Sequence, residues 1–547
     1  MSQGFACFLI ICIAAIFFDC GSWTYRKESA EKIDFIEEMI HKETSNLEVN
    51  LIFNPEIIKE LYESHADLFS EVWQSRESQK EMLYAIRNAN LDGLCPEDYH
   101  LSAIENLIRS INQSEDVLTG DIVKLELLLV DSFILLSTHL AGGKTHAETI
   151  DPQWNVARRI VRSDLHKFID STFRNNRIRE GLQALTPRHR EYNNLKTALL
   201  KYRQIELNGG WEAFSTLLPK LEFGMRHPDI MSLRKRLAIT QSFIAYDSLD
   251  EDLFDQSLLA QVMLFQVRNG LASDGVIGKA TIDAMNISVQ DRIASIEANL
   301  ERWRWIGDDL GDCYIKVNIA NFELQVIDHD SIVFNTAAIV GRSFRETPVF
   351  SSSMTYLVLN PDWTVPPTIL KNDIIPSVKN NPAYLSERNL KILNRDGVEI
   401  DPASIDWNSV AADGFPYRIN QAPGRDNALG SVKFIFPNKH NVYIHDTPNR
   451  SLFGRTDRSL SSGCIRVSNP FELTAWLLKD NPYWTPRQIQ HSLDQGKERA
   501  VVLLNPIQVH ILYLTAWASD DGVVYFRKDI YERDFPLLAA LRQNPPE

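Results

Sequence analysis

The sequence predicts a multidomain α+β protein, in which helical regions precede a β-rich C-terminal domain. The chain has 547 residues, which is too long for one ordinary domain. Apolar residues follow a helical spacing over residues 30–230, and from Cys313 onward they alternate with polar residues. Because 44% of the residues are hydrophobic, disordered and low-complexity chains are excluded.

Charge and cysteine content narrow the function classes. The net charge of −15 argues against a nucleic-acid binder, because such binding needs positive charge to displace counterions. Six cysteines are too few for a disulfide scaffold, and no C-x-x-C or H-E-x-x-H spacing indicates a metal. We therefore expect neither a metal nor a cofactor. At least one of Cys95, Cys313 and Cys464 must be unpaired, and a disulfide between the first two stays open.

The N-terminus predicts export. The run Phe5–Phe18 is apolar throughout, is shorter than the roughly 20 residues of a membrane span, and is typical of a signal-peptide core. We expect residues 1–22 to be a cleaved signal peptide or an uncleaved membrane anchor. The bulky and acidic neighbours of Cys20 disfavour a lipoprotein site there. No later stretch is expected to reach membrane-spanning length.

Residues 30–230 are expected to form a helical scaffold domain. Apolar residues recur at helical spacing over residues 121–140. Helix breakers such as Asp92-Gly93 and Asn208-Gly209-Gly210 separate the predicted helices. The region holds no dense cluster of catalytic residue types, which favours a structural role.

A second helical unit is predicted at residues 235–296. Leu258–Asn286 is expected to form a helix, a turn at Asp274-Gly275 and a second helix, with Gly270 capping the first. The segment resembles the peptidoglycan-binding domain family, whose recurrent pattern is matched by Phe265, Gln266, Gly270, Leu271, Asp274, Gly275, Gly278 and Thr281. The resemblance implies a wall-binding module, although glycan binding and simple packing both stay open.

Residues 310–515 are expected to form the β-rich domain. Alternation over residues 315–319 and 322–326 predicts a hairpin. Further strands are expected at residues 354–359, 432–436 and 442–444. The long interruption at residues 363–420 is rich in Pro, Asn and Asp and is expected to be a lid. Residues 516–547 are expected to be a C-terminal tail.

His445 and Cys464 are the candidate catalytic pair of this domain. A thiol attacks an acyl carbon as the thiolate, and a free cysteine of pKa about 8.5 is ionised only to a few per cent at pH 7. A nearby histidine can remove the proton or stabilise the thiolate as an ion pair. Gly463 allows the backbone to approach the substrate, and its N–H could face an oxyanion. Arg466 adds a positive charge that could favour the thiolate or hold a carboxylate.

The stretch from His445 to Ser462-Gly463-Cys464-Ile465-Arg466 resembles the active-site motif of the L,D-transpeptidases, cysteine enzymes of bacterial cell-wall crosslinking. Further segments resemble the large lid-bearing Gram-negative subgroup, namely Asn360–Ile369, Gln421–Gly424, Asn427–Gly430, His445–Pro448 and Tyr513–Trp517. Members of that subgroup join a helical scaffold, a peptidoglycan-binding module and a catalytic domain. The resemblance therefore covers nearly the whole chain after the export segment.

The resemblance implies roles for individual residues. Cys464 is expected to be the nucleophile and His445 the base, with the N–H groups of Gly463 and Cys464 donating to the oxyanion. The residues expected in the substrate site are Tyr443, Asp446, Ser462, Arg466 and Trp363. Tyr443 and Asp446 are also expected to orient His445, Asp446 through its backbone carbonyl. For Tyr443 and Ser462, packing and turn formation are the alternative.

The implied reaction is a two-step acyl transfer in the periplasm. Cys464 attacks a meso-diaminopimelate carbonyl in a tetrapeptide stem and releases D-alanine. The side-chain amine of a second stem then attacks the thioester and forms a diaminopimelate-to-diaminopimelate crosslink. Water as acceptor would give carboxypeptidase activity, and the amine of an outer-membrane lipoprotein would give protein attachment. A lid would help to exclude water, and carbapenems are expected to inactivate the cysteine.

Two other readings belong to different classes. A non-catalytic peptidoglycan-binding scaffold with a degenerate transpeptidase domain is the main alternative, and the intact His445 and Cys464 argue against it. A zinc amidase is weaker still, because no matching ligand spacing is present.

Overall fold

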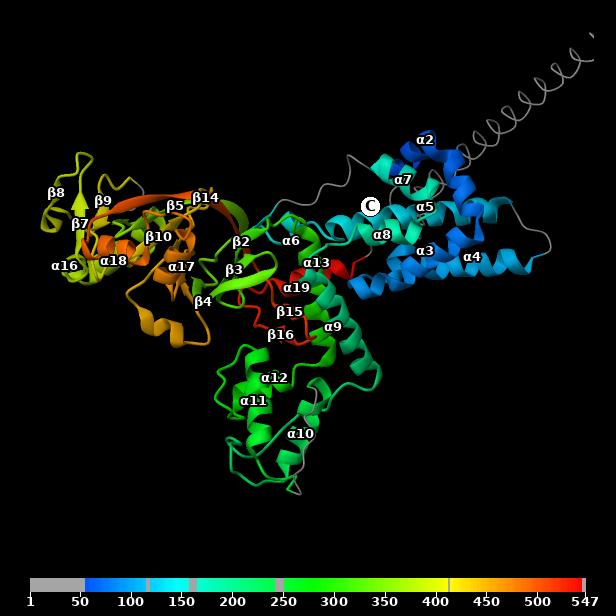
Figure 1. Ribbon diagram of the computed structural model, residues 1–547, viewed down its shortest axis with the longest axis horizontal. Helices are drawn as coiled ribbons and strands as arrows, with labels where there is room; N and C mark the ends of the chain where they lie inside the picture. The colour runs from blue at the N-terminus through cyan, green and yellow to red at the C-terminus, as the bar shows by residue number, and fades with distance from the viewer. Residues whose placement is uncertain (1–54, 115–118, 157–164, 242–249, 412–413, 544–547) are drawn as a thin grey trace, which may run out of the picture.

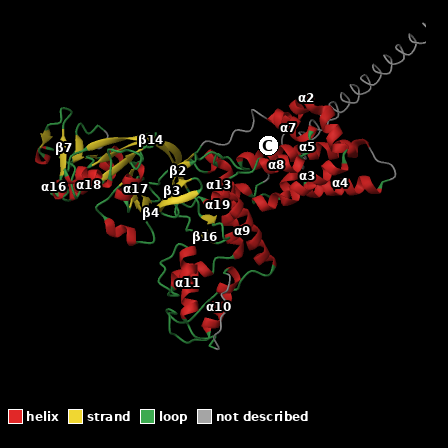
Figure 2. Ribbon diagram, viewed as in Figure 1, coloured by secondary structure: helices red, strands yellow, loops and turns green. Residues whose placement is uncertain are grey.

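The computed structural model describes residues 55–114, 119–156, 165–241, 250–411 and 414–543. The predicted export segment, residues 1–22, lies outside these ranges. The scaffold helices lie at one end of the molecule and the lid at the other, and the small helical module projects from the side (Figure 1). Strands are confined to the lid end and the centre, as Figure 2 shows.

The scaffold is a helical domain built around α5 (Thr119–Gly142). Around it lie α2 (Pro55–Gln74), α3 (Arg76–Asn88), α4 (Leu101–Gln113), α7 (Leu165–Arg174) and α8 (Ile178–Ala184). Short helical turns lie at η1 (Ala89–Asp92), η2 (Pro96–Tyr99) and α6 (Ala147–Ile150). Within the described ranges α5 alone is long and apolar enough to cross a membrane, contrary to the expectation that no later stretch would be. Its apolar window is 94% buried by its neighbours, as in the core helix of a folded domain.

The small module contains the predicted helix, turn and helix. These are α11 (Gln256–Arg268) and α12 (Lys279–Met285), and Gly270 and Gly275 have the positive φ angles expected for cap and turn. A further helix, α10 (Asp229–Thr240), completes the module. Its core also includes Phe214 and Leu221. The extended segment that follows Gly209-Gly210 packs on the module. The module therefore begins about 20 residues before the expected boundary.

The β-rich domain is a sheet that closes on itself. The strands follow the order β5, β10, β11, β13, β4, β3, β2 and β14, and pairing of β14 with β5 completes the ring. Their bounds are β2 (Cys313–Asn318), β3 (Glu323–Asp328), β4 (Ser331–Gly341), β5 (Val349–Leu359), β10 (Val432–Ile435), β11 (Ile444–His445), β13 (Ile465–Val467) and β14 (Arg499–Leu512). The antiparallel pairing of β2 with β3 confirms the predicted hairpin. The outer elements are β12 (Ser459–Ser461), α17 (Pro470–Leu477), α18 (Pro486–Asp494) and η6 (Arg450–Gly454).

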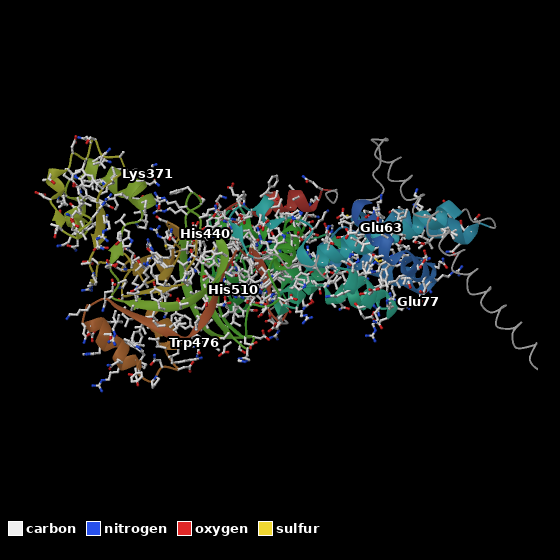
Figure 3. The ribbon with its side chains drawn as sticks, turned by 90° about the horizontal axis from the view of Figure 1, so that it is seen from above. Glu63, Glu77, Lys371, His440, Trp476 and His510 are labelled. Carbon is white, nitrogen blue, oxygen red and sulfur yellow. The ribbon has the colours of Figure 1, made fainter. Side chains whose placement is uncertain are left out.

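The lid, residues 363–421, is a folded subdomain with its own sheet. The sheet order is β6 (Trp363–Thr364), β9 (Arg418–Gln421), β7 (Leu390–Leu393) and β8 (Glu399–Ile400). Its helical segments are α14 (Pro367–Ile369), η4 (Leu370–Ile374), α15 (Ile375–Asn380) and α16 (Tyr384–Glu387), with a short turn η5 (Pro402–Ser404). Ile374, Leu385, Ile392 and Ile419 form a separate hydrophobic core. In Figure 3 Lys371 marks the lid, and Glu63 and Glu77 mark the scaffold at the opposite end.

The C-terminal segment is part of the fold rather than the expected tail. It forms β15 (Ala516–Ala518), β16 (Val524–Phe526) and α19 (Asp534–Leu541), whose apolar residues join the central core. Asp534 forms an ion pair with the buried Arg302, with 2.6 Å between Oδ1 and Nη1. The backbone carbonyl of Leu541 accepts a hydrogen bond from Lys144 of the scaffold at 2.8 Å. Apolar burial and buried charges on both sides therefore hold this segment in place.

Helix α13 (Val289–Trp305) and helix α9 (Arg190–Leu207) connect the parts at the centre. Although the first half of α13 was expected in the small module, its apolar residues belong to the central core. The scaffold also adds a strand to the catalytic sheet, because β1 (Trp154–Asn155) pairs with β5. Ala147, Trp154 and helix α9 therefore share one core with the β-rich domain, whereas the helices around α5 have a core of their own.

Candidate active site

Three neighbouring strands bring the candidate catalytic side chains to one face of the sheet. His445 on β11 pairs with Lys433 on β10 and with Arg466 on β13. Because side chains alternate along a strand, Tyr443 lies on the face of His445, and Cys464 lies on the face of Arg466. The Tyr443 and His445 ring centroids are 5.5 Å apart, and Lys433 Nζ lies 4.1 Å from the Tyr443 centroid.

Cys464 is half-buried beside Tyr443. Its Sγ lies 3.9 Å from the Asn441 carbonyl, and the Tyr443 hydroxyl hydrogen-bonds to the sulfur. Burial raises the pKa of the Cys464 thiol, while Tyr443, Lys433 and Arg466 oppose the rise. In the described part of the chain no hydrogen bond joins this thiol to the His445 ring. The resting thiol is therefore protonated at neutral pH.

His445 is buried and held by the backbone. Its Nδ1 lies 2.5 Å from the Asp446 carbonyl, and since a carbonyl only accepts, Nδ1 carries the proton. Burial, followed by the charge of Arg466, lowers the pKa of His445 to about 3. The ring is therefore neutral with Nε2 as its basic nitrogen. Of the two arrangements that the sequence left open, this conformation contains the neutral thiol and neutral imidazole, not the ion pair.

Asp446 supports His445 but does not face a substrate. Its carboxylate accepts the Ser431 N–H at 2.8 Å and the Thr447 N–H at 2.6 Å, and pairs with Arg450 at 2.6 Å. The residue is 3% exposed. The expectation that Asp446 lines the substrate site is therefore wrong in this conformation, because its carboxylate oxygens are buried and already bonded.

The nucleophile turn, Ser461–Cys464, is closed by a side chain that the sequence analysis missed. Ser461 Oγ donates to the Cys464 carbonyl at 2.6 Å and accepts the Gly463 N–H at 3.1 Å. The Gly463 N–H is therefore occupied, which contradicts its expected role as an oxyanion donor in this conformation. The Cys464 N–H makes no hydrogen bond among the residues that the structure describes. A serine two residues before the glycine is a turn signal that could have indicated the Ser461 contacts.

Position 463 requires glycine because of its backbone conformation, not because a side chain would lack room. Its φ angle is +112°, a region that side chains strongly disfavour. A Cβ there would lie 3.5 Å from the Glu346 carbonyl, which is an ordinary contact. The turn that presents Cys464 therefore depends on the backbone freedom of glycine.

The remaining predicted residues lie around the same turn. Trp363, the first lid residue, hydrogen-bonds to Tyr443, and the exposed Ser462 hydroxyl accepts a hydrogen bond from Arg345 at 2.9 Å. Arg466 lies beside the thiol, and burial lowers its pKa. The structure therefore brings Trp363, Tyr443, Ser462 and Arg466 together at Cys464.

Lys433 is a further cation at the site that the sequence analysis missed. Burial lowers the pKa of Lys433. Neither Lys433 nor Arg466 forms an ion pair with any residue in the described ranges, and Arg466 Nε is buried without a hydrogen-bond partner. Two unpaired cations beside a thiol suit an anionic substrate group.

Within the described ranges, neither Cys95 and Cys313 nor the metal-ligating residue types form a second site. Cys95 is exposed, Cys313 is half-buried, and both are free thiols, so they do not form a disulfide. Among the described residues no group of three or more His, Cys, Asp and Glu side chains is arranged to hold a metal ion.

The fold and the site define a cysteine transpeptidase type of domain, a lidded β-rich domain that presents a thiol beside a buried histidine. Residues 312–489 match the family model described as "L,D-transpeptidase catalytic domain". Residues 56–199 match "Scaffold domain", and residues 226–285 match "Putative peptidoglycan binding domain". The chain therefore carries an L,D-transpeptidase catalytic domain together with scaffold and peptidoglycan-binding domains. This confirms the family resemblance and the fold class predicted from the sequence.

A relative in Haemophilus influenzae, named "Putative L,D-transpeptidase", is 39% identical over 242 residues. The aligned part covers 44% of this chain and 48% of the relative, so the chain spans about half of that protein's length. The crystal structure of an L,D-transpeptidase from Xylanimonas cellulosilytica is 14% identical, covers 55% of this chain and 100% of that one, and has a TM-score of 0.18. The crystal structure of an L,D-transpeptidase from Stackebrandtia nassauensis is 12% identical. It covers 55% of this chain and 97% of that one, and has a TM-score of 0.21. These two likenesses carry no argument about function.

Proposed function

We propose that this protein is a cysteine L,D-transpeptidase that forms diaminopimelate-to-diaminopimelate crosslinks between peptidoglycan stems through a thioester on Cys464. The observation that carries the proposal is the shared face on which β11 holds His445 and the turn before β13 holds Cys464, next to a folded lid. Donor and acceptor are both peptidoglycan tetrapeptide stems. The reaction requires no cofactor and no nucleic acid.

In the first step His445 Nε2 accepts the thiol proton of Cys464 as the sulfur attacks the donor carbonyl. Burial and the charge of Arg466 keep His445 neutral at physiological pH, so the lone pair of Nε2 is free to accept a proton. The Cys464 N–H has no partner in the described structure and can donate to the developing oxyanion. His445 then returns the proton to the leaving amine of D-alanine.

The charges around the thiol support a stem as donor. Tetrapeptide stems carry carboxylates near the bond that is cleaved, and Lys433 and Arg466 offer unpaired positive charge at that place. The chain as a whole is acidic at −15, so this positive charge is local to the site. We infer that these two cations orient the donor stem.

In the second step the amine of an acceptor stem attacks the thioester and frees the thiol. Water is the competing nucleophile, and a folded lid over the thioester favours the amine by excluding bulk water. Hydrolysis would give a carboxypeptidase, and a lipoprotein amine would give protein attachment. Arg345 contacts both Asp373 of the lid and Ser462 next to Cys464, which places the lid beside the thiol and supports crosslinking over hydrolysis.

The peptidoglycan-acting domains imply an extracytoplasmic location. We propose that this location is the periplasm, with residues 1–22 acting as a cleaved signal or as an inner-membrane anchor. The mass of the purified mature protein distinguishes the two, because cleavage removes the N-terminal residues.

The direct test incubates the purified protein with disaccharide-tetrapeptide and identifies the products by mass spectrometry. We expect D-alanine release together with crosslinked dimer, and a carbapenem adduct of one per protein by intact mass. Cys464→Ala should abolish both, whereas Cys313→Ala, which removes another half-buried free thiol, should preserve both. Dimer formation by Cys464→Ala at the wild-type rate would refute the proposal. D-alanine release without dimer would make the enzyme a carboxypeptidase. Binding to sacculi without thiol acylation would favour the non-catalytic alternative.

A further inference from the structure

The loop between β4 and β5, residues 342–348, bonds to three successive residues of the nucleophile turn. The bonds run from the Arg342 N–H to the Ser461 carbonyl at 3.1 Å, from Arg345 Nη1 to Ser462 Oγ at 2.9 Å, and from Thr347 Oγ1 to the Gly463 carbonyl at 2.8 Å. The turn that presents Cys464 is thus fixed from outside as well as by Ser461. A change in this loop is transmitted directly to the turn.

Arg345 also reaches the lid. Its Nη1 lies 2.5 Å from one carboxylate oxygen of Asp373 in η4, and its Nη2 lies 3.1 Å from the other. Such a bidentate contact fixes both the distance and the relative orientation of the guanidinium and the carboxylate. The Arg345 side chain is 15% exposed and that of Asp373 is 36% exposed, so solvent screens the pair only in part.

The Asp373 contact is a second attachment of the lid, separate from the one at its base. Trp363 bonds to Tyr443 where the lid leaves the sheet. Asp373 lies ten residues further on, in the same helical segment as Lys371, which Figure 3 places at the lid end of the molecule. The lid therefore contacts the β-rich domain at two places, Trp363 and Asp373, that are separate in the chain.

We propose that Arg345 is a latch, a positioning residue that holds the lid closed through Asp373 and couples that closure to the nucleophile turn through Ser462. With the latch closed, the guanidinium is fixed on both sides and the turn is held in place. When Asp373 leaves, Arg345 loses its fixed position, Ser462 loses its donor, and water gains access to Cys464.

The consequence for product choice rests on the proposed function. Attack by an acceptor amine breaks the C–S bond, forms an amide and returns a proton to the sulfur. Attack by water breaks the same bond, forms a free carboxylic acid and also regenerates the thiol. The latch therefore selects between two nucleophiles for one thioester, and opening it is not expected to slow thioester formation.

The first test measures thiol access and needs no stem substrate. The full-length protein is treated with iodoacetamide, and peptide mass mapping gives the alkylation rate of Cys464 relative to the exposed Cys95. Arg345→Gln and Asp373→Asn should each raise this ratio about tenfold, the size expected for losing charge-assisted hydrogen bonds. Arg345→Lys keeps the charge but not the fork, and should fall between wild type and Arg345→Gln.

A matched control breaks a lid ion pair that does not touch the turn. Lys391→Gln removes the exposed Lys391–Glu399 contact of 2.7 Å and should leave the ratio unchanged. If Arg345→Gln and Asp373→Asn alkylate at the wild-type ratio, the latch is refuted. An equal increase in the Lys391→Gln variant would refute it too, because the effect would then be general loosening of the lid.

The second test measures product choice with disaccharide-tetrapeptide. In Arg345→Gln and Asp373→Asn the ratio of crosslinked dimer to hydrolysed tripeptide should fall about tenfold, while carbapenem acylation of Cys464 should not fall. A variant that merely loses structure lowers acylation and both products together. Because Arg345→Gln already removes the contact that Asp373→Asn breaks, the double variant should be no worse than Arg345→Gln alone.

The two tests separate failure of the latch from failure of the proposed function. If wild-type protein converts no stem at all, the proposed function is wrong, and the alkylation ratio still decides whether Arg345 controls access to Cys464. If stems are crosslinked but neither the alkylation ratio nor the product ratio changes, the proposed function stands and the latch does not.

Discussion

At the residue scale, burial shifts the pKa values of His445 and Cys464 in opposite directions. Burial disfavours the ionised form of both groups, so it lowers the pKa of His445 and raises that of Cys464. Lys433 and Arg466 favour the thiolate but disfavour an imidazolium. The effects of the two cations on the ion pair therefore offset one another, and burial of both groups leaves a neutral base next to a neutral thiol.

This arrangement predicts the pH dependence of Cys464 alkylation. Because burial raises the pKa of the Cys464 thiol above that of a free cysteine, the thiolate fraction, and with it the rate, should keep rising between pH 7 and 10. An imidazolium–thiolate pair would instead give a plateau at neutral pH. The measurement is the iodoacetamide rate at Cys464 by peptide mass mapping over this range. A flat rate from pH 5 to 8 would contradict the neutral pair.

Lys433 should contribute to substrate binding. Lys433→Met removes an unpaired cation next to Cys464, so we expect the KM for disaccharide-tetrapeptide to rise about tenfold with a smaller change in kcat. The pKa of the thiol should rise further, because Lys433 lowers it. Lys439→Met, on an exposed position beyond the end of the same strand, is the control. Equal kinetic constants for both variants would show that Lys433 does not recognise the donor.

The residues found from the sequence differ in kind from those that were missed. His445, Gly463 and Cys464 lie in one contiguous motif, so a short stretch of sequence is enough to identify them. Lys433 reaches the site through strand register, and Arg345 reaches it through a loop more than 100 positions away. Neither the strand register of Lys433 nor the loop contact of Arg345 can be predicted from one sequence, because both depend on contacts between segments distant in the chain.

At the element scale, local periodicity predicted the local elements well. The β2–β3 hairpin and the α11–α12 pair follow from spacing and turn residues. Closure of the sheet does not, because β14 pairs with both β2 and β5, which are distant in the chain. The central strand β11 has only two residues, too few to show a period.

Gly463 offers a test of the turn as an element. Gly463→Ala places a side chain at φ +112°, so we expect a loss of about 1–3 kcal/mol in the free energy of unfolding and a large fall in acylation rate. The measurements are denaturant unfolding of the full chain and carbapenem acylation. Gly454→Ala, at a position where a Cβ meets nothing within 4 Å, should leave both near wild type. Full acylation by Gly463→Ala would show that the turn tolerates a side chain.

At the scale of the whole molecule, the order of the parts could be predicted from the sequence, but the buried contacts that join them could not. Helix α13 carries Glu301, Arg302 and Arg304, and charged residues of this kind normally indicate an exposed surface. All three are buried, because their partners come from the scaffold and from the C-terminal segment. The same contacts explain why residues after 516 are a structural component.

The last prediction concerns this central contact. Arg304 is fully buried, pairs with Glu301 at 2.6 Å and donates to the Asp92 carbonyl of the scaffold at 2.5 Å. Arg304→Ala would leave the Glu301 carboxylate buried without its ion-pair partner, which costs about 3–5 kcal/mol. Native-state hydrogen exchange of α13 measures this cost as a lower opening free energy.

The matched control is Lys279→Ala, which breaks the exposed Lys279–Asp283 pair of 2.7 Å and should cost less than about 1 kcal/mol. The double variant Glu301→Leu with Arg304→Leu should cost less than Arg304→Ala, because no charge is then left buried without a partner. If Arg304→Ala and Lys279→Ala cost the same, the central ion pair does not hold the scaffold to the catalytic domain. In that case the apolar core shared by α9, α13 and the sheet would carry the connection alone.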